Sequence, residues 1–205
     1  MALLQYYSDN SILECGLDET GVGCLSGDVY ASAVIWPKEK IDLPDDLIWL
    51  NDSKKLSPKR RESLDDFIKY TAIDYAIGVV SVEEIDEMNI LNARILAMHR
   101  AIDNLSCIPD LLLVDGNRFK DYIDPDGNKI QHKLIVKGDS KYQSIAAASI
   151  IAKNERDLYV QELDKEFPMY NWKSNKGYGS KDHYEAIKEC GITKYHRKSF
   201  KLFKN

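Results

Sequence analysis

The sequence predicts an α/β fold in which a mixed β-sheet is flanked by helices and followed by a helical C-terminal extension. Three observations support this prediction. Two runs rich in apolar and β-branched residues, at 12–18 and 28–36, have the composition of strands. Later apolar runs alternate with helical patterns, which is typical of strands joined by crossover helices. Residues 165–205 carry helix signals and an excess of positive charge.

The first predicted helix covers residues 57–70. Ser57 is a plausible N-cap, and Pro58 occupies the first helical position, where a missing backbone N–H costs nothing. One face of this segment is apolar and carries Leu64, Phe67 and Ile68. The next run, 75–81, is a predicted strand.

A second helix is predicted after that strand because apolar residues recur at spacings of three and four. They are Met88, Leu91, Ile95, Met98, Ile102 and Leu105. Pro109 then precedes the continuous apolar run 110–116, which ends in Asp115 and Gly116. This run indicates a buried central strand that ends in a turn.

The remaining elements are a short strand at 133–136, a long helix at 140–167 and a final helix at 180–191. The long helix is rich in small residues that allow close packing, and the final helix has Ser180 as N-cap and Gly191 as its stop. The turn-rich stretches 36–46 and 122–129 are short enough to be loops. We expect one domain over residues 1–205, with 165–205 as its basic helical part.

Composition excludes several classes of protein. The chain has 205 residues and is 44% hydrophobic, which is enough for one well-filled core. It shows neither a signal peptide nor an apolar run of about 18 residues, so we expect a cytoplasmic protein without a membrane span. Its four cysteines are far apart and form no C-x-x-C pair, which argues against structural zinc and against a disulfide framework.

Charge is distributed unevenly along the chain. The net charge is −5, but residues 165–205 hold ten Lys and Arg against four Asp and Glu. A basic C-terminal part could contact phosphate groups while the rest of the chain stays acidic. Small imbalances of this kind are also common in soluble proteins, so charge alone does not predict a nucleic-acid partner.

Four acidic residues stand at or near the ends of predicted strands or before a helix. Asp18 and Glu19 end the first strand, Asp115 ends the buried strand, and Asp139 stands just before the long helix. Sites in such sheets collect beyond the carboxyl ends of central strands. We therefore expect these four side chains to share one crevice, with the glycine at position 21 allowing the bend that Asp18 and Glu19 need.

Converging carboxylates repel one another unless a cation lies between them. Hard oxygen ligands favour Mg²⁺ or Mn²⁺, and two such ions can assist hydrolysis of a phosphodiester. Each acid also has an ordinary interpretation: Asp115 can belong to a turn, Asp139 can be an N-cap, and Asp18 and Glu19 can be a solvated strand end.

The stretch "GVGCLSG" at 21–27 follows the first acids directly. It does not match the dinucleotide-binding fingerprint or a phosphate-binding loop, and a tight turn is its ordinary interpretation. Next to carboxylates, however, it exposes backbone groups where a nucleic-acid strand would lie. Such groups can contact a ribose 2′-OH at close range.

Taken together, the motifs closely resemble those of ribonuclease HII, the type 2 ribonuclease H family. The resemblance runs from about residue 16 to residue 200 and rests on seven blocks in order: "LDETGVGCLSG", "LNDSKKLS", "EEIDEMNILNARILAMHRA", "PDLLLVDGNRF", "VKGDSKYQSIAAASIIAKNERD", "NKGYGS" and "HRKSF". It implies a ribonuclease H-like fold, with residues 1–205 as a single catalytic domain.

The resemblance also implies an activity, a cofactor and a substrate. The family cuts the RNA strand of RNA/DNA hybrids and nicks DNA duplexes on the 5′ side of embedded ribonucleotides, leaving 5′-phosphate and 3′-OH ends. It serves ribonucleotide excision repair and RNA primer removal with Mg²⁺ or Mn²⁺, two ions during catalysis. Its four metal-binding acids match Asp18, Glu19, Asp115 and Asp139. We expect a monomer whose partners are such hybrids or ribonucleotide-containing duplexes.

Eight further positions match substrate-binding residues of the family: Gly21, Val22, Gly23, Asn51, Lys54, Ser149, Lys153 and Tyr178. The glycine element reads the 2′-OH, and the tyrosine stacks on the deoxyribose beyond the cut. Several have simpler interpretations, such as a half-buried aromatic for Tyr178 and a packed Ser149 beside a solvated Lys153. By resemblance, His196 and Arg197 supply more distant positive charge or structural support.

One position departs from the family pattern. Val22 stands where the family usually has arginine, so we expect recognition of the 2′-OH by backbone groups to survive while an arginine–phosphate contact is lost. A non-catalytic nucleic-acid binding module that kept the fold is the alternative hypothesis, although retention of all four acids argues against it. A small-molecule phosphatase is disfavoured because Asn117 stands where that chemistry needs a second aspartate.

Overall fold

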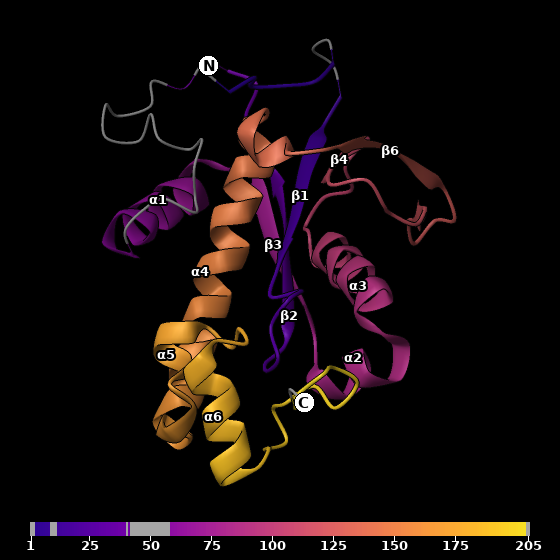
Figure 1. The fold of residues 1–205 in the computed structure, drawn as a ribbon. Coiled ribbons are helices and arrows are strands. Elements are labelled where there is room, and N and C mark those ends of the chain that lie inside the picture. The colour runs from indigo at the N-terminus through magenta and orange to yellow at the C-terminus, as the bar shows by residue number, and fades with distance from the viewer. Residues whose placement is uncertain (1–2, 9–11, 40, 42–57, 204–205) are drawn as a thin grey trace.

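The protein is built around one mixed β-sheet, seen in a computed structural model that describes residues 3–8, 12–39, 41 and 58–203 (Figure 1). Within these residues six strands form the sheet in the order β3-β2-β1-β4-β6-β5. They are β1 (Glu14–Thr20), β2 (Val29–Ile35), β3 (Asp74–Val80), β4 (Leu111–Asp115), β5 (Tyr122–Ile123) and β6 (Lys129–Ile135). The helices are α1 (Pro58–Thr71), α2 (Val82–Met88), α3 (Ile90–Asp103), α4 (Gln143–Glu166), α5 (Trp172–Asn175) and α6 (Lys181–Cys190), with short 3₁₀ turns η2 (Gly138–Ser140) and η3 (Pro168–Tyr170).

Strand directions make the sheet mixed. Strands β1, β2 and β3 form an antiparallel meander, whereas β1 pairs with β4, and β4 with β6, in parallel. Strand β5 closes the other edge as an antiparallel hairpin with β6. The predicted fold class, a mixed sheet flanked by helices, is confirmed.

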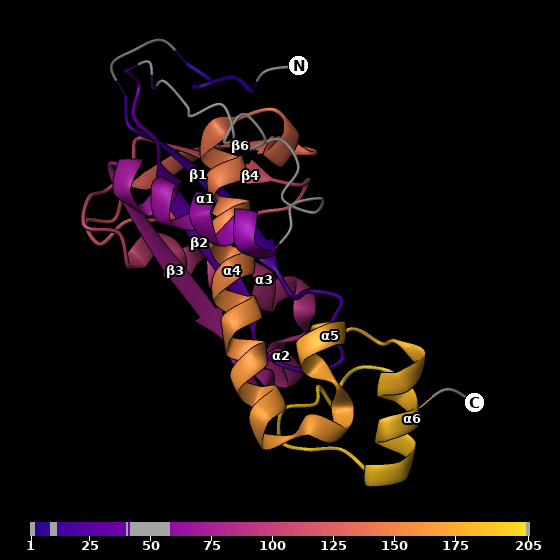
Figure 2. The same cartoon turned by 90° about the vertical axis from the view of Figure 1, so that its left-hand side faces the viewer.

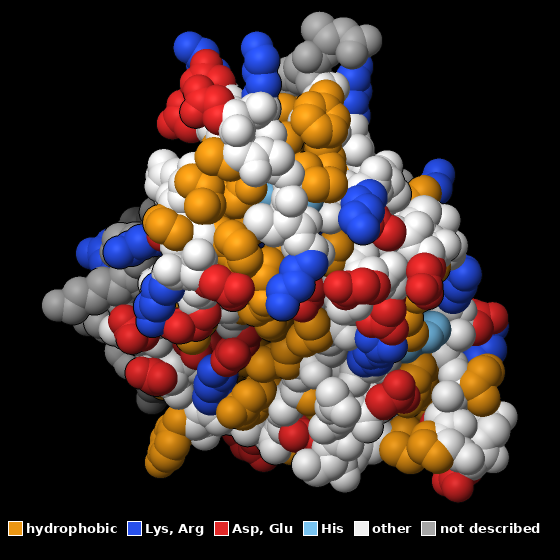
Figure 3. Space-filling view, turned by 90° about the horizontal axis from the view of Figure 1, so that it is seen from below, with side chains coloured by type: hydrophobic (Ala, Val, Ile, Leu, Met, Phe, Trp, Pro, Cys, Tyr) orange, Lys and Arg blue, Asp and Glu red, His pale blue; other side chains and the backbone are white. Residues whose placement is uncertain are grey.

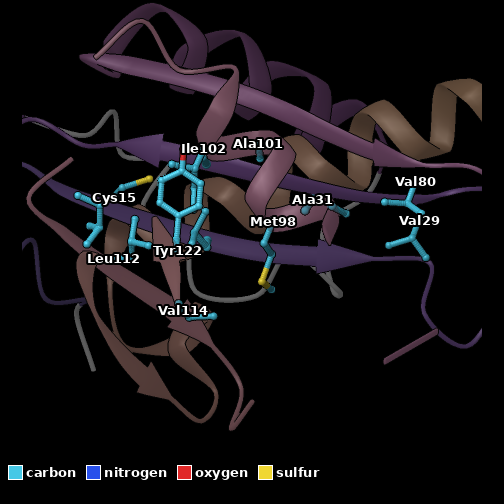
Figure 4. Close-up of a cluster of buried hydrophobic side chains, with 14 of the residues drawn as sticks. Cys15, Val29, Ala31, Val80, Met98, Ala101, Ile102, Leu112, Val114 and Tyr122 are labelled. Carbon is cyan, nitrogen blue, oxygen red and sulfur yellow. The ribbon is translucent and has the colours of Figure 1, made fainter. Parts of the chain in front are cut away.

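Helices cover both faces of the sheet. Helix α3 packs on one face, and α1 and α4 pack on the other (Figures 1 and 2). The α3 face buries one apolar cluster, in which Cys15, Ala31 and Val114 of the strands meet Met98 and Ile102 of the helix (Figure 4). Because both faces are covered, the central strands are almost continuously apolar. They end at polar residues, which include Asp18 and Asp115.

Close packing of α4 on the sheet depends on Gly16 of β1. A β-carbon at this position would lie 2.3 Å from the backbone carbon of Ser144 at the start of α4. Only glycine therefore lets the helix backbone lie directly on the strand. The small side chains in the first turns of α4, Ala146, Ala147 and Ala148, continue this contact and are buried. The two elements that carry Asp18 and Ser149 are thereby held in a fixed relation.

The C-terminal part packs at the end of α4 that is lower in Figures 1 and 2. Helices α5 and α6 and the turn η3 form an apolar cluster there with the last turns of α4, and Trp172 is its largest fully buried side chain. The basic extension predicted for 165–205 thus contains η3, α5 and α6, whereas residues 191–203 form turns and irregular chain. Its assignment to a single domain with the rest of the chain stays a prediction.

Four predicted elements were wrong in their bounds. The helix expected to span Met88 to Leu105 is two helices, because Asn89 has φ 72° and its side chain accepts hydrogen bonds from the N–H groups of Leu91 and Asn92. Asn89 thus ends α2 and caps α3, and Leu91 is left 49% exposed. The apolar spacing continued across a break that only the backbone conformation reveals.

The stretch 122–129, expected to be a loop, contains β5 and the turn of a hairpin. Asp124 accepts a hydrogen bond from the N–H of Asn128 and closes this turn. Strand β6 therefore begins at Lys129, before the predicted strand at 133–136. The long helix likewise begins at Gln143 and not at 140, because residues 138–140 form the turn η2.

Two further expectations concern whole classes of protein. The four cysteines are free thiols. Among the helices that the structure describes, none combines the length and apolarity that a membrane crossing requires.

Gly16→Ala should destabilise the protein by about 3 kcal/mol, the upper part of the range for overpacking, because the clash is with a helix backbone that cannot turn aside. Urea denaturation followed by circular dichroism measures this. Gly127→Ala is the control: its β-carbon would have nothing within 4 Å, so only the cost of its positive φ remains, about 1 kcal/mol. Equal losses in the two variants would contradict the packing argument.

Candidate active site

The site begins where β1 and β4 run side by side. Their parallel register pairs Leu17 with Val114, so Asp18 and Asp115 follow at the same level of the sheet. Asp115 is the last residue of β4, and its Oδ1 accepts a hydrogen bond of 2.6 Å from the N–H of Gly138 in η2. Because Asp139 is the next residue of that turn, this bond brings the third segment to the same place.

A pocket of about 370 Å³ lies at this junction and contains the predicted site. It is lined by all ten of the predicted residues that the structure describes, together with Thr20: Asp18, Glu19, Gly21, Val22, Gly23, Asp115, Asp139, Ser149, Lys153 and Tyr178. Asn51 and Lys54 lie outside the described residues. Segments from β1, β4, η2, α4 and the loop before α6 therefore meet in one cavity.

Asp18 and Glu19 reach this pocket from opposite faces of β1. Asp18 lies on the α4 side, where Ser149 hydrogen-bonds its carboxyl group, and Glu19 lies on the α3 side, where Arg94 is its ion-pair partner. Neighbouring strand residues alternate in this way. The strand continues through Thr20, and Gly21 then turns the chain with φ 86°, so the pocket at the strand end takes in both carboxylates.

Burial and mutual repulsion dominate the electrostatics of the two acids. Desolvation raises the pKa of Asp18 well above its ordinary value, the charges of Glu19 and Asp115 raise it further, and the Ser149 hydrogen bond opposes this. Desolvation also raises the pKa of Glu19, with Arg94 opposing and Asp115 adding to it. A nearby cation would relieve this repulsion.

The side chains do not form a ready-made metal cage. In the described part of the chain, no group of three or more His, Cys, Asp or Glu side chains could hold a metal ion as arranged here. Glu19 is turned toward Arg94, and Asp115 is engaged by the N–H of Gly138. The acids share a pocket, and a change of side-chain orientation would be needed to bring them onto one ion.

Two buried arginines hold the glycine loop from inside, and only Arg197 was named in the sequence analysis. Arg156 of α4 is 2% exposed and donates to the carbonyl groups of Ser26, Asp28 and Lys176 at 2.9–3.1 Å. Arg197 is fully buried and donates to the carbonyl groups of Gly27 and Val22. The interpretation of Arg197 as structural support thus agrees with its contacts, and Arg156 had no sequence signal because its acceptors are backbone groups.

A chain of hydrogen bonds positions the backbone at Tyr178, whose side chain is 48% exposed in the pocket. The carbonyl of Tyr178 contacts Nδ1 of His183 at 2.9 Å, and Nε2 of His183 faces both Trp172 Nε1 at 3.0 Å and His196 Nε2 at 3.2 Å. Nδ1 of His196 accepts from the N–H of Thr193. The network fixes both tautomers: His183 carries its hydrogen on Nδ1, and His196 carries its hydrogen on Nε2.

Both imidazoles are therefore uncharged and fully engaged. Burial and the neighbouring His183 lower the pKa of His196 to about 4, and burial lowers the pKa of His183. Of the two roles expected for His196, positive charge or structural support, its contacts favour structural support, because an additional proton on Nδ1 would face the N–H of Thr193.

The surface seen from below in Figure 3 carries no uniform charge. Acidic and basic side chains are interspersed, and hydrophobic side chains show between them. Positive charge at the pocket therefore has to come from individual side chains and not from a broad basic surface. Lys153, half-buried on α4, is the basic residue that lines it, and burial lowers its pKa.

Comparisons with known proteins agree with this geometry. The model of a family described as "Ribonuclease HII" matches residues 15–203. A ribonuclease HII of Phocaeicola vulgatus is 52% identical over 98% of this chain and 94% of its own length. The ribonuclease H2 of Pyrococcus horikoshii has a similar structure, with a TM-score of 0.74 and 27% identity, over 92% of this chain and 94% of its own. Bst-RNase HIII, solved in complex with Mn²⁺, shares the fold at a TM-score of 0.70 and 17% identity, over 94% of this chain and 68% of its own.

The histidine chain predicts acid sensitivity. Because the folded pKa of His196 lies below the ordinary value of 6.5, the unfolded state binds more protons between pH 6.5 and pH 4, and the contribution to stability falls as the pH falls through that window. His196→Asn cannot take up this proton. We expect the stability difference between wild type and His196→Asn to shrink by about 1 kcal/mol from pH 7 to pH 5, measured by urea denaturation.

The raised pKa values of the pocket carboxylates make the protein more stable as the pH falls, which is opposite to the effect of His196. This contribution is the same in wild type and in His196→Asn, so it cancels in the difference between them. Stability curves that stay parallel across this range would show that His196 does not titrate in this way.

Proposed function

The chain belongs to the ribonuclease HII family, and we propose that it is an endonuclease that hydrolyses the RNA strand of RNA/DNA hybrids. We further propose that it nicks duplex DNA on the 5′ side of an embedded ribonucleotide and leaves 5′-phosphate and 3′-OH ends. The proposal includes two Mg²⁺ or Mn²⁺ ions and roles in ribonucleotide excision repair and RNA primer removal.

One observation carries the proposal: a single pocket contains four carboxylates, a glycine loop, a lysine and an exposed tyrosine. Each of these kinds of group can serve in binding or hydrolysing a phosphodiester of RNA. The carboxylates can bind cations, the lysine can bind phosphate, and the loop backbone and tyrosine can contact sugars. A site for a small uncharged ligand would not need this concentration of charge.

The residues present fit a hard divalent cation. The four acids, Asp18, Glu19, Asp115 and Asp139, offer only oxygen ligands, as Mg²⁺ and Mn²⁺ prefer. Oε2 of Glu19 is buried and has no hydrogen-bond partner, which is a costly state that a ligated cation would relieve. When bound, the ions would supply an activated water and stabilisation of the leaving oxygen. Among the solved structures, Bst-RNase HIII was obtained with Mn²⁺.

The protein groups have separate tasks in this proposal. Asp18 and Asp115, fixed by adjacent strands, hold the ions most directly. Glu19 and Asp139 complete the oxygen donors and orient water. No histidine or cysteine is needed as a nucleophile, since His183 and His196 are occupied in their own network.

Substrate contacts come from α4, the glycine loop and Tyr178, which line the same pocket as the acids. Ser149 and Lys153 lie one turn apart on α4 and face the phosphate backbone. Gly23 lies beside the ring of Tyr178, since a β-carbon there would be 3.6 Å from Cε1 of the tyrosine. The glycine loop and Tyr178 therefore form one surface, on which a ribose 2′-OH can meet backbone groups while the next sugar stacks on the ring.

Asp115→Asn should keep the fold and lose at least about 10²-fold in cleavage rate, because a carboxylate that would hold the metal ions, and through them stabilise the reacting phosphate, is removed. The measurement uses a duplex with one embedded ribonucleotide, with Mg²⁺, with Mn²⁺ and with EDTA. Asp121→Asn is the control, since Asp121 pairs with Lys129 at the surface, outside the pocket. Near-normal cleavage by Asp115→Asn would refute the site, and absence of cleavage by wild type with either metal would favour the non-catalytic binding module.

Val22→Arg should strengthen binding and make it more salt-dependent, with the slope of log affinity against log salt steeper by about 0.9 for one added phosphate contact. Binding and cleavage of a single-ribonucleotide duplex and of a longer RNA tract are compared across a salt series. Ile123→Arg controls for net charge, because Ile123 is exposed on β5, at the far edge of the sheet. Superimposable salt profiles for wild type and Val22→Arg would show that position 22 makes no phosphate contact.

A further inference from the structure

Arg94 of α3 is the cation that faces the carboxylate cluster from the side opposite α4. Its Nε lies 3.2 Å from Oε1 of Glu19, and the two side chains are only 16% and 12% exposed. Yet Arg94 Nε and Glu19 Oε2 are both buried atoms without a hydrogen-bond partner. The two groups form an ion pair, but these two atoms make no hydrogen bond.

A second arginine of the same helix shows what a well-formed pair looks like. Arg100 donates two hydrogen bonds, of 2.6 and 2.9 Å, to the two carboxylate oxygens of Glu84. That pair is bidentate, as arginine–carboxylate pairs often are. The Arg94–Glu19 pair lacks this bidentate geometry although it is more buried. We therefore interpret Arg94 as a group that neutralises the charge of Glu19 and not as one that ties α3 rigidly to β1.

We propose that Arg94 is an internal counter-ion that neutralises Glu19 in the metal-free protein, competes with the divalent cation for this carboxylate, and thereby sets the metal concentration at which the site assembles. This inference rests on the proposed function, because it requires that Glu19 bind a metal ion.

The cost of burying Glu19 explains why a counter-ion is needed. A carboxylate in this position, beside Asp18 and Asp115, is destabilised by burial and by like charge unless a positive group is near. Arg94 is in contact with it through Oε1, and among the described residues no group of three or more acidic, histidine or cysteine side chains is arranged to hold a metal ion. A divalent cation that binds Glu19, even through the unpartnered Oε2, would lie close to the guanidinium, so the two positive groups would compete for this carboxylate.

The structure also provides a place for the released guanidinium. Arg94 lines a second, open pocket of about 470 Å³, whose other lining residues include Asn92 and Asn117 and two further cations, Arg118 and Lys120. The terminal nitrogen of Arg94 already lies beside Gly116, at the border of this pocket. A rotation of the side chain can therefore move the positive charge away from the incoming cation and into a solvated groove.

Competition of this kind has two linked consequences. Removal of the arginine charge should destabilise the metal-free protein, because Glu19 loses its partner. The same removal should strengthen metal binding, because the cation no longer displaces another positive group. A purely structural role for Arg94 predicts only the first effect.

The test is Mn²⁺ binding to the full chain without nucleic acid, measured by calorimetry and by the shift of thermal unfolding with Mn²⁺. For Arg94→Gln we expect a lower unfolding temperature without metal, an about tenfold tighter Mn²⁺ affinity, and a larger Mn²⁺-induced shift. Arg94→Lys keeps the charge and should stay near wild type. Arg100→Gln removes an ion pair of the same helix away from the pocket and should leave the Mn²⁺ affinity unchanged.

Unchanged or weaker Mn²⁺ binding by Arg94→Gln would overturn the proposal, as would equal behaviour of Arg94→Lys and Arg94→Gln. In a Glu19→Gln background the effect of Arg94→Gln on Mn²⁺ affinity should disappear, and its persistence would also contradict the role. If wild type binds Mn²⁺ but the variants do not differ, only the role of Arg94 fails. If wild type binds no Mn²⁺, the two-metal proposal fails as well.

Discussion

Repulsion between buried carboxylates is the constraint around which this molecule is organised. The parallel pairing of β1 with β4 brings Asp18 and Asp115 to the same level of the sheet, and Glu19 follows directly. Burial raises the pKa of Asp18 and of Glu19, the charges of Glu19 and Asp115 raise the pKa of Asp18 further, and the charge of Asp115 adds to the pKa of Glu19. Each surrounding element supplies a group that lessens this repulsion, and this explains why these elements lie next to the acids.

Each neighbouring element compensates the charge in a different way. Turn η2 gives Asp115 a backbone N–H, α4 gives Asp18 the hydroxyl of Ser149, and α3 gives Glu19 the guanidinium of Arg94. The contributions from α3 and α4 depend on helices that lie close to the sheet, and for α4 this requires Gly16. Since none of these donors carries more than one positive charge, the site keeps a surplus of negative charge that a divalent cation can use.

The sequence predicted the fold class, which is confirmed, and it grouped four acids that line one pocket, but it did not predict most of the groups that support them. Acids at strand ends are recognisable because strands have a period of two residues and end at turns, and ten predicted residues do line one pocket. Asn89 was missed because a positive φ leaves no mark in the apolar spacing. Arg156 was not recognised as a loop support because it donates to backbone carbonyls, which every residue offers, and Arg197 was expected to supply charge or structural support only through the family resemblance. The contact of Arg94 with Glu19 depends on how closely α3 approaches β1, which local sequence does not encode.

The placement of positive charge around the pocket follows from the same argument. The glycine loop carries Val22 and no cation, and its shape is fixed from within by two arginines whose charge is directed to carbonyl groups. The pocket therefore takes its exchangeable positive charge from helices, with Arg94 on α3 and Lys153 on α4. Helices packed on a covered sheet move little, so a side chain can exchange partners while the backbone stays in place. In this arrangement the backbone is fixed and the guanidinium of Arg94 can change partners. The acidic site can then fold without a metal ion and still bind one.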